Sequence, residues 1–173
     1  MIKYAAIVLR GQPFHIGHQH IADKAIKDGL QPLFMLGSAN ESGTEKNPYT
    51  VHQRAAMIRL VYPDALIGAI NDYDSYGDWL DALVMYIKHL TNTHVKSTTI
   101  YLHEKLEDLH DFTFRGVDYM NESYCKMYEV TGMHTTSLPI SDIQIRAKAI
   151  REDLEGNKQY LHPEVYKYIK GLQ

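Results

Sequence analysis

Short apolar runs alternate with helix-like patterns along the whole chain. Between the first two runs, an apolar stripe from Ile21 to Ile26 predicts a helix that ends at Gly29, a residue type favoured just past a helix C-terminus. The runs themselves are only a few residues long and lie between polar or turn-forming residues, which is typical of buried strands. They predict strands at 4–9, 32–36, 65–70, 98–102 and 134–138.

Further helices are predicted between and after the later strands. Thr50 and Gln53 form a capping-box pattern, which predicts the start of a helix over 51–61. Apolar residues spaced three or four apart over 80–90 predict another helix with one buried face. The remaining helices are predicted over 122–130, after Ser141, and from Pro163, where proline suits a first turn.

This alternation implies an α/β fold with a parallel sheet that is covered by helices on both faces. The length fits one domain over residues 1–173. Ligands in such folds bind beyond the carboxyl ends of the strands, where the strand order reverses. Residues 103–121 are the least regular segment, and we expect them to form a long loop over the site.

Composition and charge narrow the class of protein. The content is 45% hydrophobic and 23% charged, with one cysteine, no apolar stretch long enough to cross a bilayer and no leader pattern. We therefore expect a cytoplasmic protein without an internal disulfide. The net charge of −3 argues against a general nucleic-acid binder. Residues 1–60 nevertheless hold seven Lys or Arg against four acidic residues, a local balance that suits a small polyanion.

The segment after the first predicted strand carries the strongest chemical signal. His15 and His18 flank Gly17 at the start of a helix, so imidazole N–H groups and free helix amides can face one phosphate. Gly17 permits close approach of the backbone, and Pro13 fixes the turn. The alternative is that one histidine belongs to the core and the other caps the helix. A zinc site is disfavoured, because no cysteine pair or third histidine lies at ligand spacing.

Three more strand ends carry candidate binding residues. The glycine-containing loop over 37–50 contains Lys46, and Arg54 lies one turn into the next helix; both could hold phosphate oxygens. Ser141 is a good N-cap residue, with Arg146 just over one turn later. The loop over 71–79, after the third predicted strand, holds Trp79, the only tryptophan, which suits stacking on a flat aromatic ligand. Solvated loops and capped surface helices would explain the same residues without any ligand.

Together these segments resemble the nucleotidyltransferase superfamily with the H-x-G-H signature, and within it the archaeal-type nicotinamide mononucleotide adenylyltransferases. The motifs that carry the resemblance are Leu9-Arg10-Gly11-Gln12-Pro13-Phe14-His15-Ile16-Gly17-His18, Gly37-Ser38-Ala39-Asn40-Glu41-Ser42, Asn47-Pro48-Tyr49-Thr50-Val51-His52-Gln53-Arg54, and Ser141-Asp142-Ile143-Gln144-Ile145-Arg146. The resemblance implies a Rossmann-like nucleotidyltransferase fold of about five parallel strands flanked by helices. It also implies transfer of AMP from ATP to nicotinamide mononucleotide, which gives NAD and pyrophosphate.

The resemblance further implies roles for individual residues. Catalytic roles fall to His15, His18, Arg54 and Arg146. Binding roles fall to Arg10, Gln12, Pro13, Gly17, Gly37, Ser38, Lys46, Asn47, Asn71, Asp72, Trp79, Ser141 and Ile143. Mg²⁺ is expected to arrive with ATP, held mostly by phosphate oxygens and water, and relatives assemble as homo-oligomers. No nucleic acid or membrane partner is expected.

The chain departs from the family pattern at several positions. Gly11 stands where an aromatic residue is usual, and Gln53 where a glutamate is common. Asp142 and Ile143 replace a small residue and a threonine, which removes one hydroxyl donor and adds a negative charge near the phosphates. Two alternatives therefore stay open: a related transferase with another phosphorylated acceptor, and a nucleotide sensor that binds without turnover.

Overall fold

The computed structural model describes residues 3–103, 108–139 and 145–173, and its centre is a five-stranded parallel sheet. The strand order is β3-β2-β1-β4-β7, so the order reverses between β1 and β4. Ala6 of β1 pairs with Leu33 of β2 on one side and with Ile100 of β4 on the other. All five predicted strands are confirmed, with bounds Tyr4–Leu9 (β1), Gln31–Leu36 (β2), Leu66–Ala69 (β3), Thr98–His103 (β4) and His134–Leu138 (β7).

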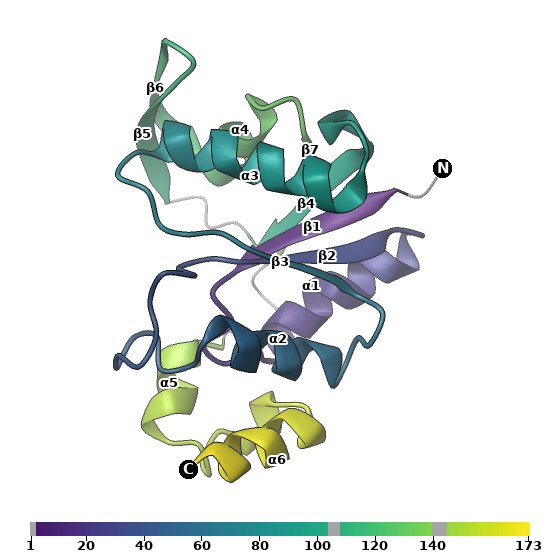
Figure 1. Ribbon diagram of the computed structural model, residues 1–173, viewed down its shortest axis with the longest axis vertical. Helices are drawn as coiled ribbons and strands as arrows, with labels where there is room; N and C mark the ends of the chain where they lie inside the picture. Colours follow the sequence, from purple (N-terminus) through teal and green to yellow (C-terminus); the bar gives the residue numbers. More distant parts are fainter. Residues whose placement is uncertain (1–2, 104–107, 140–144) are drawn as a thin grey trace.

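Helices cover both faces of the sheet (Figure 1). Side chains alternate along β1, so that Ala5 and Ile7 enter one core and Ala6 enters the other. The first core packs α1, α2, α5 and α6 against the sheet, and the second packs α3 and α4. The bounds are Ile16–Lys27 (α1), Val51–Arg59 (α2), Tyr76–Thr91 (α3), Tyr124–Glu129 (α4), Ala147–Glu152 (α5) and Pro163–Leu172 (α6), with short 3-10 turns at Val95–Ser97 and Lys158–Tyr160.

The expected long loop over 103–121 is wrong for its described part. Strands β5 (Leu109–Phe114) and β6 (Val117–Ser123) form an antiparallel hairpin. The turn residues Arg115 and Gly116 both have positive φ, which is the geometry of a tight hairpin turn. The sequence signal that was missed is the alternation of the apolar Phe112 and Phe114 with polar residues just before this turn, and the structure buries both rings. Residues 104–107 lie outside the described chain.

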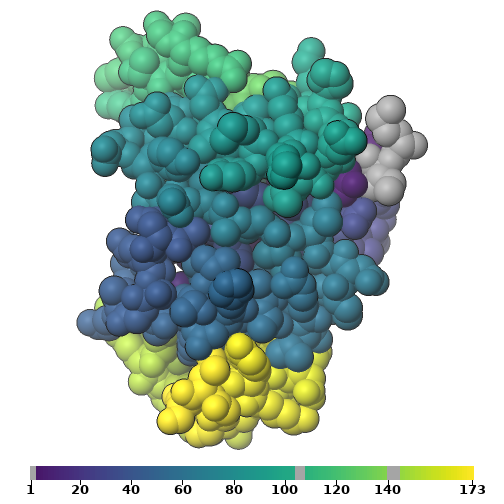
Figure 2. Space-filling view, viewed as in Figure 1, coloured from purple at the N-terminus to yellow at the C-terminus, as the bar shows by residue number. Residues whose placement is uncertain are grey.

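The hairpin and the C-terminal helix α6 lie at opposite ends of the molecule (Figure 2). Because β6 continues to Ser123, helix α4 begins at Tyr124, two residues later than predicted. The predicted helix after Ser141 is observed from Ala147 onward, and residues 140–144 lie outside the described chain. In the parts that the structure describes, no helix is both long and apolar enough to cross a membrane.

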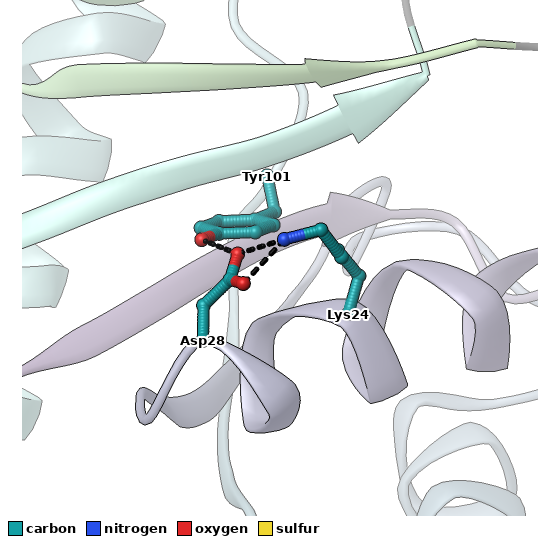
Figure 3. A network of polar contacts seen from close by, with 3 residues as sticks. All are labelled: Lys24, Asp28 and Tyr101. Carbon is teal, nitrogen blue, oxygen red and sulfur yellow. Dashed lines mark hydrogen bonds and ion pairs between the residues drawn. The ribbon is translucent and has the colours of Figure 1, made fainter.

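A polar network fixes the far end of α1 to the sheet (Figure 3). The Tyr101 hydroxyl of β4 donates to Asp28 Oδ2 at 2.7 Å, and Lys24 forms an ion pair with the same carboxylate. The hydrogen bond from Lys24, followed by that from Tyr101, lowers the pKa of Asp28, which therefore stays charged at neutral pH. Helix α1 is thus tied to β4 at its C-terminal end and begins at the carboxyl end of β1.

Candidate functional site

His15 and His18 form a reciprocal cap at the start of α1. Gly17 N–H donates to His15 Nδ1 at 3.1 Å, and His15 N–H donates to His18 Nδ1 at 3.2 Å. The two rings stack with their centroids 3.8 Å apart. A Cβ on residue 17 would lie 2.9 Å from His15 Cε1, so glycine is what allows the ring to fold back on the helix start. Both histidines therefore cap the helix, and neither Nε2 takes part in these bonds.

Burial keeps both imidazoles neutral. Desolvation, followed by the charge of His103, lowers the pKa of His15 to about 4. Desolvation, followed by the charges of His15 and His103, also lowers the pKa of His18. Since each Nδ1 accepts a backbone N–H, the proton of each neutral ring is on Nε2. The pair thus offers two Nε2–H donors in the free protein, and a bound polyphosphate would raise both pKa values.

His103 lies at the carboxyl end of β4, across the point where strand order reverses. It affects the charge state of both His15 and His18, and its ring centroid is 5.6 Å from that of His20. His103 also lines the cavity described next. The sequence analysis did not assign His103 to the site, although the residue directly follows the predicted strand over 98–102, and ligands of such folds bind at the carboxyl ends of strands.

A cavity of about 630 Å³ opens at the carboxyl ends of β1, β2 and β4. Trp79 lies among tyrosines at what we call the aromatic end of the cavity, and Arg10 and His103 also belong to its lining. The Trp79 ring is 6.2 Å from that of Tyr128, centroid to centroid. The lining therefore combines aromatic surface that suits a flat ring with groups that suit an anion. The full lining is Val8, Leu9, Arg10, Gly37, Ser38, Asp72, Tyr73, Asp74, Ser75, Tyr76, Trp79, Leu102, His103, Tyr124, Met127 and Tyr128.

The loops after β2 and β3 are tied together at the edge of this cavity. Ser38 Oγ donates to Asp72 Oδ1 at 3.0 Å, and Asp72 N–H donates to Asn40 Oδ1 at 2.8 Å. Ser38 has φ of +46°, a left-handed conformation that is uncommon for a residue with a side chain. Gly37, Ser38 and Asp72 line the cavity, whereas Asn71 is exposed and is not part of the lining. The binding roles of all four stay predictions.

Arg54 lies one turn into α2 as predicted, but its side chain does not face the cavity. The residue is fully buried, so its side chain is closed off from any ligand in the cavity. Its Nη1 donates to the carbonyls of Arg10 and Gly37, each at 2.7 Å, and Nη2 donates to that of Ser38 at 3.4 Å. The predicted direct contact with phosphate is therefore wrong, and Arg54 instead joins the carboxyl ends of β1 and β2. Burial lowers the pKa of Arg54, and the charge of Asp72 opposes that shift.

Gln12 and Asn47 also have structural partners. The Gln12 side chain brackets the backbone of Tyr49, because Nε2 donates to its carbonyl at 3.0 Å and Oε1 accepts its N–H at 2.9 Å. Asn47 is buried, and its Nδ2 donates to Glu41 Oε2 at 2.6 Å. With Pro13, which is buried in the same turn, these residues fix the two loops against each other.

A second cavity of about 680 Å³ shares Arg10 with the first. Arg151 holds this cavity together, because its Nη1 donates to the Gln12 carbonyl at 2.7 Å and its Nε to that of Glu45 at 3.1 Å. Lys46 lies here as well, together with two basic residues of α5 that sequence reasoning missed. The cavity is lined by Arg10, Glu45, Lys46, Pro48, Tyr49, Lys148, Arg151 and Glu152, so basic residues outnumber acidic ones.

The last predicted motif is described only in part. Arg146 is the N-cap residue of α5 and is exposed. Ser141 and Ile143, together with Asp142, lie outside the described residues. Among the residues that are described, no group of three or more His, Cys, Asp or Glu is placed to hold a metal ion.

Comparisons with known proteins agree with this arrangement. A "Nicotinamide-nucleotide adenylyltransferase" of Aeropyrum pernix is 26% identical over 99% of this chain and 92% of its own length. One from Methanolobus tindarius is 34% identical, over 37% of each chain. The crystal structure of a bifunctional NMN adenylyltransferase/ADP ribose pyrophosphatase from Francisella tularensis has the same fold, with a TM-score of 0.73 and 20% identity.

These matches differ in extent. The alignment with the Francisella protein covers 99% of this chain but only 49% of that protein, so the chain spans about half its length. The cytidylyltransferase-like family model matches residues 12–152, which include the histidine pair, the loops after β2 and β3, and the whole of α5. Since this match covers most of the sequence, the chain belongs to the cytidylyltransferase-like family.

Proposed function

We propose that this protein is a nicotinamide-nucleotide adenylyltransferase, which transfers AMP from ATP to nicotinamide mononucleotide and releases NAD and pyrophosphate. The observation that carries the proposal is the 630 Å³ cavity where strand order reverses, whose lining combines Trp79 with Arg10 and His103. The named activity of the Aeropyrum relative, which aligns over nearly the whole chain, supports the same reaction.

The chemistry asks the protein for positioning and charge stabilisation. The phosphate of the mononucleotide attacks the α-phosphorus of ATP, and pyrophosphate leaves in line, without a covalent enzyme intermediate. His15 and His18 donate their Nε2–H groups to the triphosphate, where negative charge builds. Arg10 lines both cavities and is thereby suited to the phosphates that lie between the two nucleosides.

The phosphate chain extends toward the second cavity in this proposal. Lys46 contributes a mobile positive charge there, and Arg151 keeps the Gln12 turn and the Glu45 backbone in register. The β- and γ-phosphate roles of Ser141, Ile143 and Arg146 stay predictions from the resemblance. So do the homo-oligomeric assembly and the cytoplasmic location.

Mg²⁺ fits this arrangement as a companion of ATP. The described residues offer no cluster of ligands for a metal held by the protein, so triphosphate oxygens and water are the donors that suit it. When bound, the ion neutralises part of the charge on the phosphates. Trp79 stacks on the nicotinamide ring at the aromatic end of the first cavity, beside Tyr128.

The test is a turnover assay with a panel of acceptors. Purified protein is incubated with ATP, Mg²⁺ and, in separate reactions, nicotinamide mononucleotide, its deamidated form, phosphopantetheine or a sugar phosphate, and pyrophosphate release is measured. The proposal expects release, together with NAD, for nicotinamide mononucleotide. Release with a different acceptor alone would assign a related transferase. Calorimetric binding of ATP and NAD without any pyrophosphate would assign a nucleotide sensor.

A further inference from the structure

The β5–β6 hairpin is anchored to the start of α3. Phe112 and Phe114 point into the core beneath α3, and Arg115 in the turn forms an ion pair with Asp81 at 2.8 Å. The backbones also approach closely, because a Cβ on Gly77 would lie 2.4 Å from the Thr113 carbonyl oxygen. The hairpin therefore has a fixed position against the helix that carries Tyr76 and Trp79.

One hairpin side chain lies directly behind the aromatic end of the first cavity. The His110 ring centroid is 4.1 Å from that of Tyr124 and 5.6 Å from that of Tyr76, which it meets edge to face. Tyr76 and Tyr124 line the cavity, whereas His110 lies outside the lining. His110 thus touches two wall residues from different helices without facing the ligand space itself.

The hairpin also leads directly into the cavity wall. The residue pair farthest from the hairpin turn is Leu109 with Ser123. Ser123 is also the N-cap residue of α4, where its Oγ accepts the N–H of Lys126 at 3.2 Å. Tyr124 is the next residue, and Met127 and Tyr128 follow it into the same lining. Any shift of the hairpin therefore moves three lining residues of α4 together.

We propose that the β5–β6 hairpin sets the affinity of the first cavity for the flat base of a mononucleotide, with His110 as the positioning residue that holds Tyr76 and Tyr124 in place. The proposal rests on the proposed function only for the identity of the mononucleotide. The contacts involved are ring against ring, so they act on the base. The ring contacts of His110 are with Tyr76 and Tyr124 and not with Arg10 or His103, so we expect the phosphate contacts to be unaffected.

Trp79 provides a direct readout, since it is the only tryptophan of the chain and lines this cavity. Its fluorescence is titrated with nicotinamide mononucleotide in the full chain and in His110→Ala. The variant is expected to bind about three- to tenfold more weakly, the equivalent of one aromatic contact. His110→Phe, which keeps a flat ring, restores the affinity to within about twofold of the unmodified protein.

Leu109→Ala is the matched control, because Leu109 precedes His110 on the same strand but is 51% exposed. It is expected to leave the titration unchanged. In the turnover assay, His110→Ala raises KM for nicotinamide mononucleotide by the same factor and leaves kcat and the KM for ATP unchanged. Two results would overturn the proposal. One is a loss of affinity in His110→Phe equal to that in His110→Ala, and the other is an equal rise of the KM for nicotinamide mononucleotide and the KM for ATP in His110→Ala.

The two proposals fail in different ways. A fluorescence response to the mononucleotide without any NAD formation removes the proposed function and leaves the role of His110 measurable. NAD formation with identical constants in His110→Ala and the unmodified protein removes the role of His110 and leaves the function intact. An unmodified protein whose Trp79 fluorescence ignores the mononucleotide also removes the hairpin inference.

Discussion

The rings of His15 and His18 stack 3.8 Å apart, each with its Nδ1 bound to a backbone N–H of the same helix start. The cap and the proposed phosphate role therefore do not compete, since they use different nitrogen atoms. The backbone bonds select the tautomer, and the tautomer directs both N–H donors away from the helix backbone. A helix cap thus becomes a pair of oriented donors.

The first prediction concerns stability against pH. The pKa of His15 is about 4 in the folded protein and about 6.5 when unfolded, so the unfolded state binds more protons between these values. The free energy of unfolding therefore falls as pH decreases through this window, by about 2 kcal/mol from His15 between pH 7 and pH 5. His18 adds to the fall, because its pKa is lowered as well. Urea denaturation at both pH values measures it.

His15→Asn is the control for this pH dependence. Asparagine is a good N-cap residue and does not titrate, so the variant keeps a cap and loses one buried proton acceptor. The difference in unfolding free energy between pH 7 and pH 5 should shrink in this variant. An unchanged difference would assign the pH dependence to other groups and contradict the burial of a neutral His15.

The second prediction concerns the catalytic donor. In the proposed mechanism His18 donates an N–H to developing charge. We therefore expect His18→Ala to lower kcat about 100-fold while the KM for nicotinamide mononucleotide changes little. Steady-state kinetics with each substrate varied in turn gives both constants. A variant with unchanged kcat would exclude His18 from the chemistry. Circular dichroism checks that α1 persists, since the alanine also removes the acceptor for His15 N–H.

The third prediction concerns the buried arginine. Arg54→Gln removes a charge that holds three backbone carbonyls, and the free energy of unfolding should fall by about 3 kcal/mol. Arg59→Ala on the same helix is the control, because Arg59 is exposed and should change stability by under about 0.5 kcal/mol. Urea denaturation measures both variants. Equal losses of unfolding free energy would show that the carbonyl contacts of Arg54 do not stabilise the fold.

Arg54 also marks the limit of what the sequence could predict. The motif placed Arg54 correctly at a helix start, close to the residues that follow β1 and β2. The sequence could not show, however, which face of α2 turns inward. A fully buried guanidinium needs several acceptors at once, and these carbonyls belong to residues that follow β1 and β2, whose ends meet only in the folded sheet. A long-range contact of this kind leaves no local pattern.

The strands were predictable because their signal is local. Apolar runs bounded by turn residues placed β1 and β7 at their observed bounds. The hairpin was missed because its strands are half exposed and form no continuous apolar run, with Leu109, Val117 and Met120 all facing solvent. Arg151 was missed for a related reason: its two carbonyl partners lie 139 and 106 residues earlier in the chain.

The fourth prediction concerns the aromatic end of the cavity. Trp79→Ala should raise KM for nicotinamide mononucleotide about tenfold or more, because stacking on the ring is lost, while the KM for ATP stays within about twofold. Trp79→Phe keeps a flat surface and should recover most of the affinity. Equal losses for both substrates would contradict stacking on the nicotinamide and would place Trp79 in a purely structural role.

The last prediction concerns the contact that anchors the hairpin. In Gly77→Ala the new Cβ would lie 2.4 Å from the Thr113 carbonyl, and neither backbone can yield without moving the hairpin or α3. The free energy of unfolding should fall by about 1–3 kcal/mol, as expected for overpacking.

Gly171→Ala in α6 is the matched control, since its Cβ meets nothing within 4 Å. That variant should keep or slightly raise stability, because alanine is the better helix former. If both variants unfold at the same urea concentration as the unmodified protein, the close approach of hairpin and helix is not tight in solution, and the wall behind Tyr76 is free to move.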